Sequence, residues 1–177
     1  MRLFIAIPLP PQAHEALRNA QNELKRFCSG GRFVPPENFH ITLHFLGETD
    51  QLREAVDALR QGIRGIRPFP LSLGEYDSFR QSRNRTSFIS LQGDLDELKL
   101  LHQTINSALL DQGFPRQRQK FQPHITLGRN IEHDELAEME LLHCCEPVSF
   151  TAQEVVLFES KNIKGRMVYT PLHTERL

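Results

Sequence analysis

Residues 38–47 read Asn38-Phe39-His40-Ile41-Thr42-Leu43-His44-Phe45-Leu46-Gly47, and residues 123–129 read Pro123-His124-Ile125-Thr126-Leu127-Gly128-Arg129. The tetrapeptide His-Ile-Thr-Leu therefore occurs twice, which indicates an internal repeat. Apolar and β-branched residues followed by a glycine predict a short strand for each copy. Because alternate side chains of a strand share a face, we expect each histidine and threonine to point one way and the apolar pair to point into a core.

Two histidine–threonine pairs that face one cleft are suited to displacement at phosphorus. The unperturbed histidine pKa lies near neutrality, so one imidazole can act as a base while the other acts as an acid. The hydroxyls of Thr42 and Thr126 can donate hydrogen bonds to non-bridging phosphoryl oxygens. We therefore predict His40, Thr42, His124 and Thr126 as catalytic residues.

Paired His-x-Thr-x motifs resemble those of the two-histidine (2H) phosphoesterase superfamily. The chain is most similar to its RNA 2′,3′-cyclic phosphodiesterases, also described as LigT-like 2′-5′ RNA ligases. Four further stretches fit the resemblance, which thus spans nearly the whole chain: Arg2–Pro10, Phe45-Leu46-Gly47, Arg129 and Tyr169-Thr170-Pro171-Leu172.

The resemblance implies an activity and a role for each histidine. The expected reaction is metal-independent hydrolysis of RNA 2′,3′-cyclic phosphate ends to the 2′-phosphate, reversible as 2′-5′ RNA ligation, with no cofactor. By resemblance, His40 is the proton donor and His124 the proton acceptor; the symmetric motifs themselves do not distinguish the two. The implied partners are RNA ends or nucleotides that carry a 2′,3′-cyclic phosphate.

Composition limits the class of protein. The chain has 177 residues and a formal charge of −1, which argues against non-specific coating of nucleic acid but leaves room for a local basic pocket. Its three cysteines have no metal-ligand spacing and indicate reduced thiols. No apolar run is long enough to cross a membrane and no secretory pattern opens the chain. We expect one cytoplasmic, monomeric domain over residues 1–177.

The order of elements predicts an α+β fold with helices over antiparallel sheets. We expect two pseudo-symmetric lobes, each with its helices outside and one His-x-Thr-x strand facing a central cleft. Helices are predicted at 11–28, 50–66, 94–111 (with Asp94 as its cap) and 132–142. Strands are predicted at 2–8, 69–77, 86–92, 150–159 and 166–172 in addition to the two motifs, and a loop is predicted from Ser29 to the first motif.

Several residues outside the motifs are candidates for substrate binding. Arg83 and Arg85 lie in a predicted hairpin tip and can contact RNA phosphates. Strict alternation places Arg129 on the face opposite His124, so it reaches the same phosphate only if the strand bends at Gly128. His44 shares the predicted face of His40 and borders the cleft, but it has no counterpart in the second copy and is left out of the catalytic set.

Two other classes of function remain open. A non-catalytic RNA-binding module would use Arg83 and Arg85 with aromatic residues such as Phe39, Phe45 and Phe121, because bases stack on aromatic rings. Aromatic rings in the cleft would help either function, so Phe45 and Phe121 are also candidates for substrate binding in the enzyme. A zinc hydrolase would use both histidines as ligands, yet neither motif supplies a carboxylate or cysteine at ligand spacing. Within the enzyme class, the substrate can also be another nucleotide cyclic phosphate or a 2′-5′ oligonucleotide.

Overall fold

The protein is described by a computed structural model that covers residues 1–177. Its helices are α1 (Pro11–Phe27), the 3-10 turn η1 (Pro36–Asn38), α2 (Leu52–Gly62), α3 (Leu95–Asp111) and α4 (Glu135–Leu141). Its strands are β1 (Arg2–Ile7), β2 (Gly30–Phe33), β3 (Ile41–Glu48), β4 (Phe69–Gln81), β5 (Asn84–Gly93), β6 (His124–Glu132), β7 (Ser149–Ala152), β8 (Glu154–Ile163) and β9 (Arg166–Arg176).

The strands form two separate sheets in which every pairing is antiparallel. One sheet has the order β3-β1-β8-β9 and the other has the order β2-β6-β5-β4-β7. The first motif opens β3 and the second opens β6, so each sheet carries one copy. This arrangement confirms the predicted α+β fold of two lobes.

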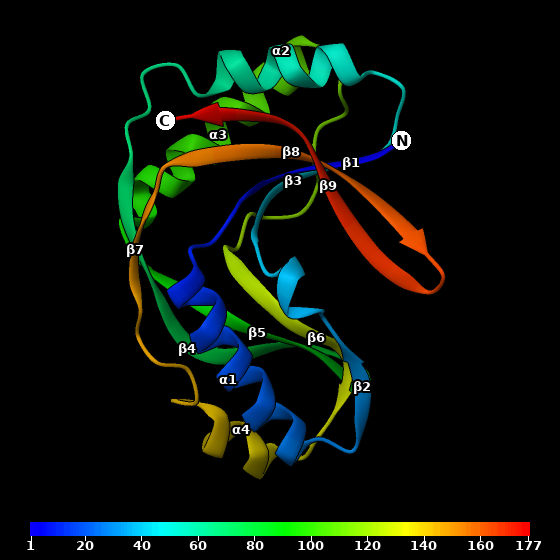
Figure 1. Ribbon diagram of the computed structural model, residues 1–177, viewed down its shortest axis with the longest axis vertical. Helices are drawn as coiled ribbons and strands as arrows, with labels where there is room; N and C mark the ends of the chain where they lie inside the picture. The colour runs from blue at the N-terminus through cyan, green and yellow to red at the C-terminus, as the bar shows by residue number, and fades with distance from the viewer.

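The helices divide between the lobes but not in chain order. Helices α2 and α3 pack on each other and on β8, β9 and β3 of the four-stranded sheet, whereas α1 and α4 pack on β6 and β4 of the five-stranded sheet (Figure 1). The chain therefore passes between the lobes several times: β1, β3, α2, α3, β8 and β9 belong to one lobe, and α1, β2, β4, β5, β6, α4 and β7 belong to the other. Because both lobes contain distant parts of the sequence, neither is a contiguous segment.

Burial of apolar helix faces fixes these positions. Helix α1 buries Ala13, Ala16, Leu17, Ala20 and Leu24 at helical spacing. One apolar cluster of 38 buried residues runs through both lobes. The carboxylate of Asp94 accepts a hydrogen bond from the Glu97 amide, which confirms the predicted cap of α3. None of the helices has both the length and the apolar character needed to span a membrane.

Two parts of the chain differ from the predicted elements. Residues 30–33 were predicted as loop, but they form the edge strand β2, which pairs with β6. The two glycines before Arg32 do not prevent the backbone from pairing. The predicted single strand 150–159 is two strands in different sheets: β7 pairs with β4, and after Gln153 the chain enters β8, which pairs with β1. The apolar pattern continues through this break, so periodicity alone does not reveal the change of sheet.

Candidate active site

The two motif strands carry the same β-bulge after their threonine. On β3, Thr42 pairs with Ala6 and His44 pairs with the preceding Ile5, so Leu43 has no partner of its own. On β6, Thr126 pairs with Phe88 and Gly128 pairs with the preceding Ser87, which leaves Leu127 without a partner. A bulge of one residue reverses the alternation of side chains beyond it.

The bulges explain which residues reach the cleft. In both copies the threonine is half-buried, the next two residues are buried, and the residue after them is exposed. That exposed residue is Phe45 on β3 and Arg129 on β6, and both line the same cleft. The strict alternation expected for Arg129 is thus broken at Leu127, one residue before the predicted bend at Gly128. The corresponding bulge on β3 turns His44 away from the cleft and into the protein interior, where its side chain is fully buried.

A side chain at Gly128 would crowd the bulge of β6 because β2 lies close to it. A Cβ atom on Gly128 would lie 2.8 Å from Cδ1 of Ile131 and 3.2 Å from the carbonyl oxygen of Arg32. The end of the Ile131 side chain can move away, but the Arg32 carbonyl belongs to the backbone, so β2 would have to shift slightly away from β6.

Each motif histidine is oriented by the carbonyl two residues before it. Nδ1 of His40 lies 2.6 Å from the carbonyl oxygen of Asn38, and Nδ1 of His124 lies 2.7 Å from that of Gln122. A carbonyl oxygen only accepts, so Nδ1 carries the proton and Nε2 of the neutral ring keeps its lone pair. These contacts were not predicted, because the acceptors are backbone carbonyls and any residue at these positions would supply one.

The Nε2 atoms of the two histidines differ in their hydrogen bonds. The Thr42 hydroxyl donates to Nε2 of His40 over 2.7 Å, whereas Nε2 of His124 has no hydrogen-bond partner. The His40 ring packs against Phe4 and Tyr169, and the His124 ring packs against Phe79 and Phe88. These aromatic walls hold both rings in place.

Burial and one guanidinium disfavour the charged form of both histidines. The pKa of His40 is lowered to about 4, mainly by burial and also by the charges of Arg129 and His124, while the hydrogen bond to Asn38 opposes them. Burial also lowers the pKa of His124, again with a contribution from Arg129. Arg129 therefore lies close enough to both rings to act on them electrostatically, and the structure brings these three residues together.

The cleft beside these residues encloses about 920 Å³. Phe4, Phe45 and Tyr169 line it from the four-stranded sheet, and Arg129 lines it from β6. Neither histidine is among the lining residues: His40 packs behind Phe4 and Tyr169, which line the cleft, and the charge of Arg129, which also lines it, acts on both His40 and His124. Its charged lining residues are all arginines, namely Arg2, Arg32, Arg129 and Arg166, and no carboxylate faces it. Such a cleft is suited to an anionic ligand with an aromatic or flat part.

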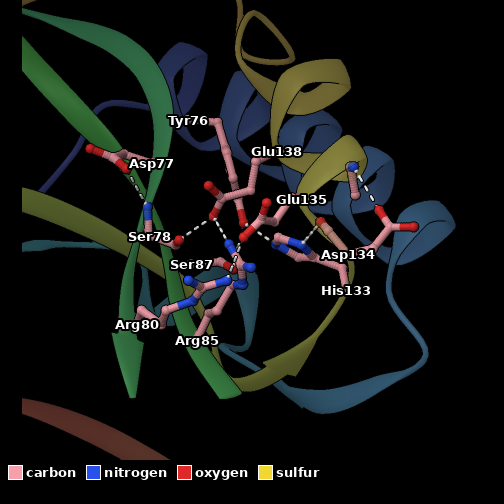
Figure 2. A network of polar contacts seen from close by, with 11 residues as sticks. Tyr76, Asp77, Ser78, Arg80, Arg85, Ser87, His133, Asp134, Glu135 and Glu138 are labelled. Atoms are coloured by element: carbon pink, nitrogen blue, oxygen red, sulfur yellow. Dashed lines mark hydrogen bonds and ion pairs between the residues drawn. The ribbon is translucent and has the colours of Figure 1, made fainter. Parts of the chain in front are cut away.

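The two hairpin arginines have different surroundings. Arg83 is exposed in the turn between β4 and β5, away from the cleft lining. Arg85 is buried and forms an ion pair with Glu138 of α4, which also accepts from Ser78 (Figure 2). Arg80 pairs with Glu135 beside it. Arg85 thus fastens α4 to the hairpin and is not available to RNA, which is a correction to its predicted role.

Two of the aromatic candidates also lie elsewhere. Phe39 is buried in the core. Phe121 does not line the cleft but stacks on His102 with ring centres 4.0 Å apart, and His102 stacks in turn on His44 at 4.3 Å. Of the three candidate aromatics, only Phe45 has its ring in the cleft.

No group of three or more His, Cys, Asp or Glu side chains is arranged to hold a metal ion. The two motif histidines have arginine, threonine and aromatic neighbours in place of a third ligand. This donor set does not match a catalytic zinc site, which takes three protein ligands.

Comparison with known proteins agrees with this geometry. The sequence model of the "2'-5' RNA ligase superfamily" matches residues 8–163. An RNA 2′,3′-cyclic phosphodiesterase of Methanothermobacter thermautotrophicus is 28% identical over 100% of this chain and 99% of its own. One of Escherichia coli is 30% identical over 97% of this chain and 93% of its own.

Solved structures share the whole fold. TT0787 of Thermus thermophilus superposes with a TM-score of 0.78 at 28% identity, covering 100% of this chain and 98% of that one. E. coli LigT complexed with 3′-AMP gives 0.73 at 28% identity, over 99% and 97% of the two chains. With a family match over most of its length and both motifs at one cleft, this chain belongs to the 2′-5′ RNA ligase superfamily.

Proposed function

We propose that this protein is an RNA 2′,3′-cyclic phosphodiesterase that opens the cyclic phosphate to a 2′-phosphate without a metal ion. The observation that carries the proposal is the pair of equivalent histidines, each with its Nδ1 proton held by a carbonyl and its Nε2 left for proton transfer. The curated relatives that span this chain bear the same activity in their names.

In the proposed reaction the two histidines act on opposite sides of phosphorus. Nε2 of His124 removes a proton from water as its oxygen bonds to phosphorus, and the bond from phosphorus to O3′ breaks. Nε2 of His40 gives its proton to O3′, so the product carries a 2′-phosphate and a free 3′-hydroxyl. The acid and base are assigned by family resemblance. With the 5′-hydroxyl of a second RNA strand in place of water, the same displacement would form a 2′-5′ phosphodiester as the bond from phosphorus to O3′ breaks, which is 2′-5′ ligation.

Three neighbours support the charge that develops on the phosphoryl oxygens. Thr42 would exchange its bond to His40 for one to a non-bridging oxygen, and Thr126 would donate from the other strand. The Arg129 guanidinium compensates the phosphate charge. The bound phosphate would in turn raise the pKa of His40 from about 4 toward the range in which it can carry the proton.

The substrate end would lie in the cleft with its base against an exposed ring. Phe45 is 61% exposed there and is the best placed to stack on a base. We place the enzyme in the cytoplasm as a monomer, supported by its three free cysteines and one continuous core, and treat residues 1–177 as one catalytic domain.

The test is turnover of an oligonucleotide ending in a 2′,3′-cyclic phosphate, with and without EDTA, in an assay that separates 2′- from 3′-phosphate products. We expect the 2′-phosphate and no effect of EDTA. Loss of activity in EDTA would assign the histidines to a metal. Binding without turnover, insensitive to replacement of either histidine, would favour an RNA-binding module.

A further inference from the structure

Arg32 on β2 lies directly opposite Arg129 on β6 in the register of the five-stranded sheet. Both residues are exposed, both line the cleft, and neither forms an ion pair with a carboxylate. Like charges that face each other across two strands destabilise a sheet. A pair of this kind at the wall of a cleft points to an anion that offsets the repulsion.

The rest of the cleft strengthens the argument. Of its four arginines, only Arg166 has an acidic partner, Glu37, and no aspartate or glutamate is among the lining residues. Arg2 and Tyr169 both line the cleft. Burial raises the pKa of the Tyr169 phenol, and the charges of Arg129 and Arg2 oppose that effect. The cleft thus holds more positive charge than one phosphate beside the histidines requires.

The two opposing arginines are at different distances from the reacting phosphate. Arg129 is on β6, the strand that carries His124, and its charge acts on both motif histidines, whereas Arg32 is on the neighbouring edge strand β2. Neighbouring strands are about 4.8 Å apart, so Arg32 is one strand further from the histidines. A second anion on Arg32 would therefore be adjacent to the first but distinct from it.

We propose that Arg32, assisted by Arg2, binds the 5′-phosphate of the terminal nucleotide whose 2′,3′-cyclic phosphate lies at the histidines. In an RNA strand this 5′-phosphate is the next one along the chain, and a free nucleoside 2′,3′-cyclic phosphate lacks it. The cleft then selects RNA ends over such nucleosides. The inference rests on the proposed function for the identity of the first phosphate.

Binding of product analogues tests the subsite without turnover. Adenosine 2′,5′-bisphosphate and adenosine 2′-monophosphate differ only in the 5′-phosphate, and calorimetry measures their Kd values. We expect Arg32→Ala to weaken the bisphosphate about tenfold and to leave the monophosphate within about twofold, since a guanidinium–phosphate contact is charge-assisted. Arg32→Lys should recover part of the loss. The exposed Arg64→Ala, outside the cleft, is the matched control. Equal losses for both ligands, or none for either, would overturn the proposal.

Turnover then separates this proposal from the proposed function. Adenosine 2′,3′-cyclic phosphate is compared with its 5′-phosphorylated form, and we expect Arg32→Ala to lower kcat/KM only for the second, mainly through KM. Hydrolysis of both with no discrimination by Arg32 would refute the subsite and leave the function standing. An Arg32-dependent preference for binding the bisphosphate, with no hydrolysis of either cyclic compound, would refute the proposed function and leave the subsite standing.

Discussion

At the scale of single residues, the tautomers and charges of the two histidines determine the chemistry. The carbonyls of Asn38 and Gln122 fix the same tautomer in both rings, so the two Nε2 atoms are equivalent proton carriers. Burial and Arg129 lower both pKa values, so the free enzyme holds few imidazolium ions at neutral pH. A mechanism that needs one imidazolium and one imidazole is therefore fastest below neutrality until substrate raises these values.

Replacing Arg129 should move the pH dependence in a defined direction. The guanidinium disfavours protonation of His40 and His124, so Arg129→Gln should raise both pKa values. We expect the kcat/KM profile, measured between about pH 4 and pH 8, to shift toward higher pH while its maximum falls roughly 10²-fold from the lost phosphate contact. Arg64→Ala serves as the control. A lower maximum with unchanged midpoints would mean that Arg129 acts only on the substrate.

At the scale of elements, the motif strands were predictable in position but not in shape. Composition and the repeat located both strands, and alternation correctly put Ile41 and Ile125 in the core. The bulges were not predictable, because they depend on the pairing with β1 and β5. They place Phe45 and Arg129 in the cleft and His44 in the core. The salt bridge of Arg85 likewise depends on α4, which approaches the hairpin only in the folded chain.

The stack of His44, His102 and Phe121 ties the two motif segments together. His44 follows the first motif on β3, His102 belongs to α3, and Phe121 lies three residues before His124. Loss of the middle ring in His102→Ala should lower the free energy of unfolding by about 1–2 kcal/mol and reduce kcat more than it changes KM, because the approach to His124 loosens.

His102→Phe retains an aromatic ring in that place and should restore most of both losses. Urea unfolding and steady-state kinetics on the two variants provide the check, with the exposed His143→Ala as control. If alanine and phenylalanine behave alike, the stack does not position the second motif.

At the scale of the whole molecule, the active site exists only where two interleaved lobes meet. The sequence predicted two sheets with one motif each, because the motifs repeat and the helices are amphipathic. It did not predict which helices pack on which sheet, since α1 follows β1 yet packs on the other lobe. Nor did it indicate β2 or the passage from β7 to β8, which depend on pairing across the fold. Arg32 was consequently missed, because only β2 brings it to Arg129.

The buried histidines should make the whole fold sensitive to acid. The pKa values of His44 and His40 are both lowered to about 4, mainly by burial. In the unfolded chain both side chains titrate near 6.5. Between these values the unfolded chain binds more protons than the folded one, so stability is greatest above pH 6.5 and falls as the pH drops toward 4. For each histidine the loss amounts to about 3 kcal/mol.

Urea unfolding at a series of pH values measures this loss. His44→Phe keeps a ring in the stack and removes one proton-binding site, so its stability should change less over the same interval. An equal change in the variant and the wild type would show that His44 does not contribute.

The most direct test of two-histidine catalysis is the kinetic comparison of His40→Ala, His124→Ala and the double variant, in EDTA, on a 2′,3′-cyclic-phosphate-ended oligonucleotide. We predict a loss of roughly 10²–10⁴ in kcat for each single variant. The double variant should be hardly worse, because an acid and a base that act in one step fail together. A single variant that keeps its fold and stays within about tenfold of the wild type would contradict the account.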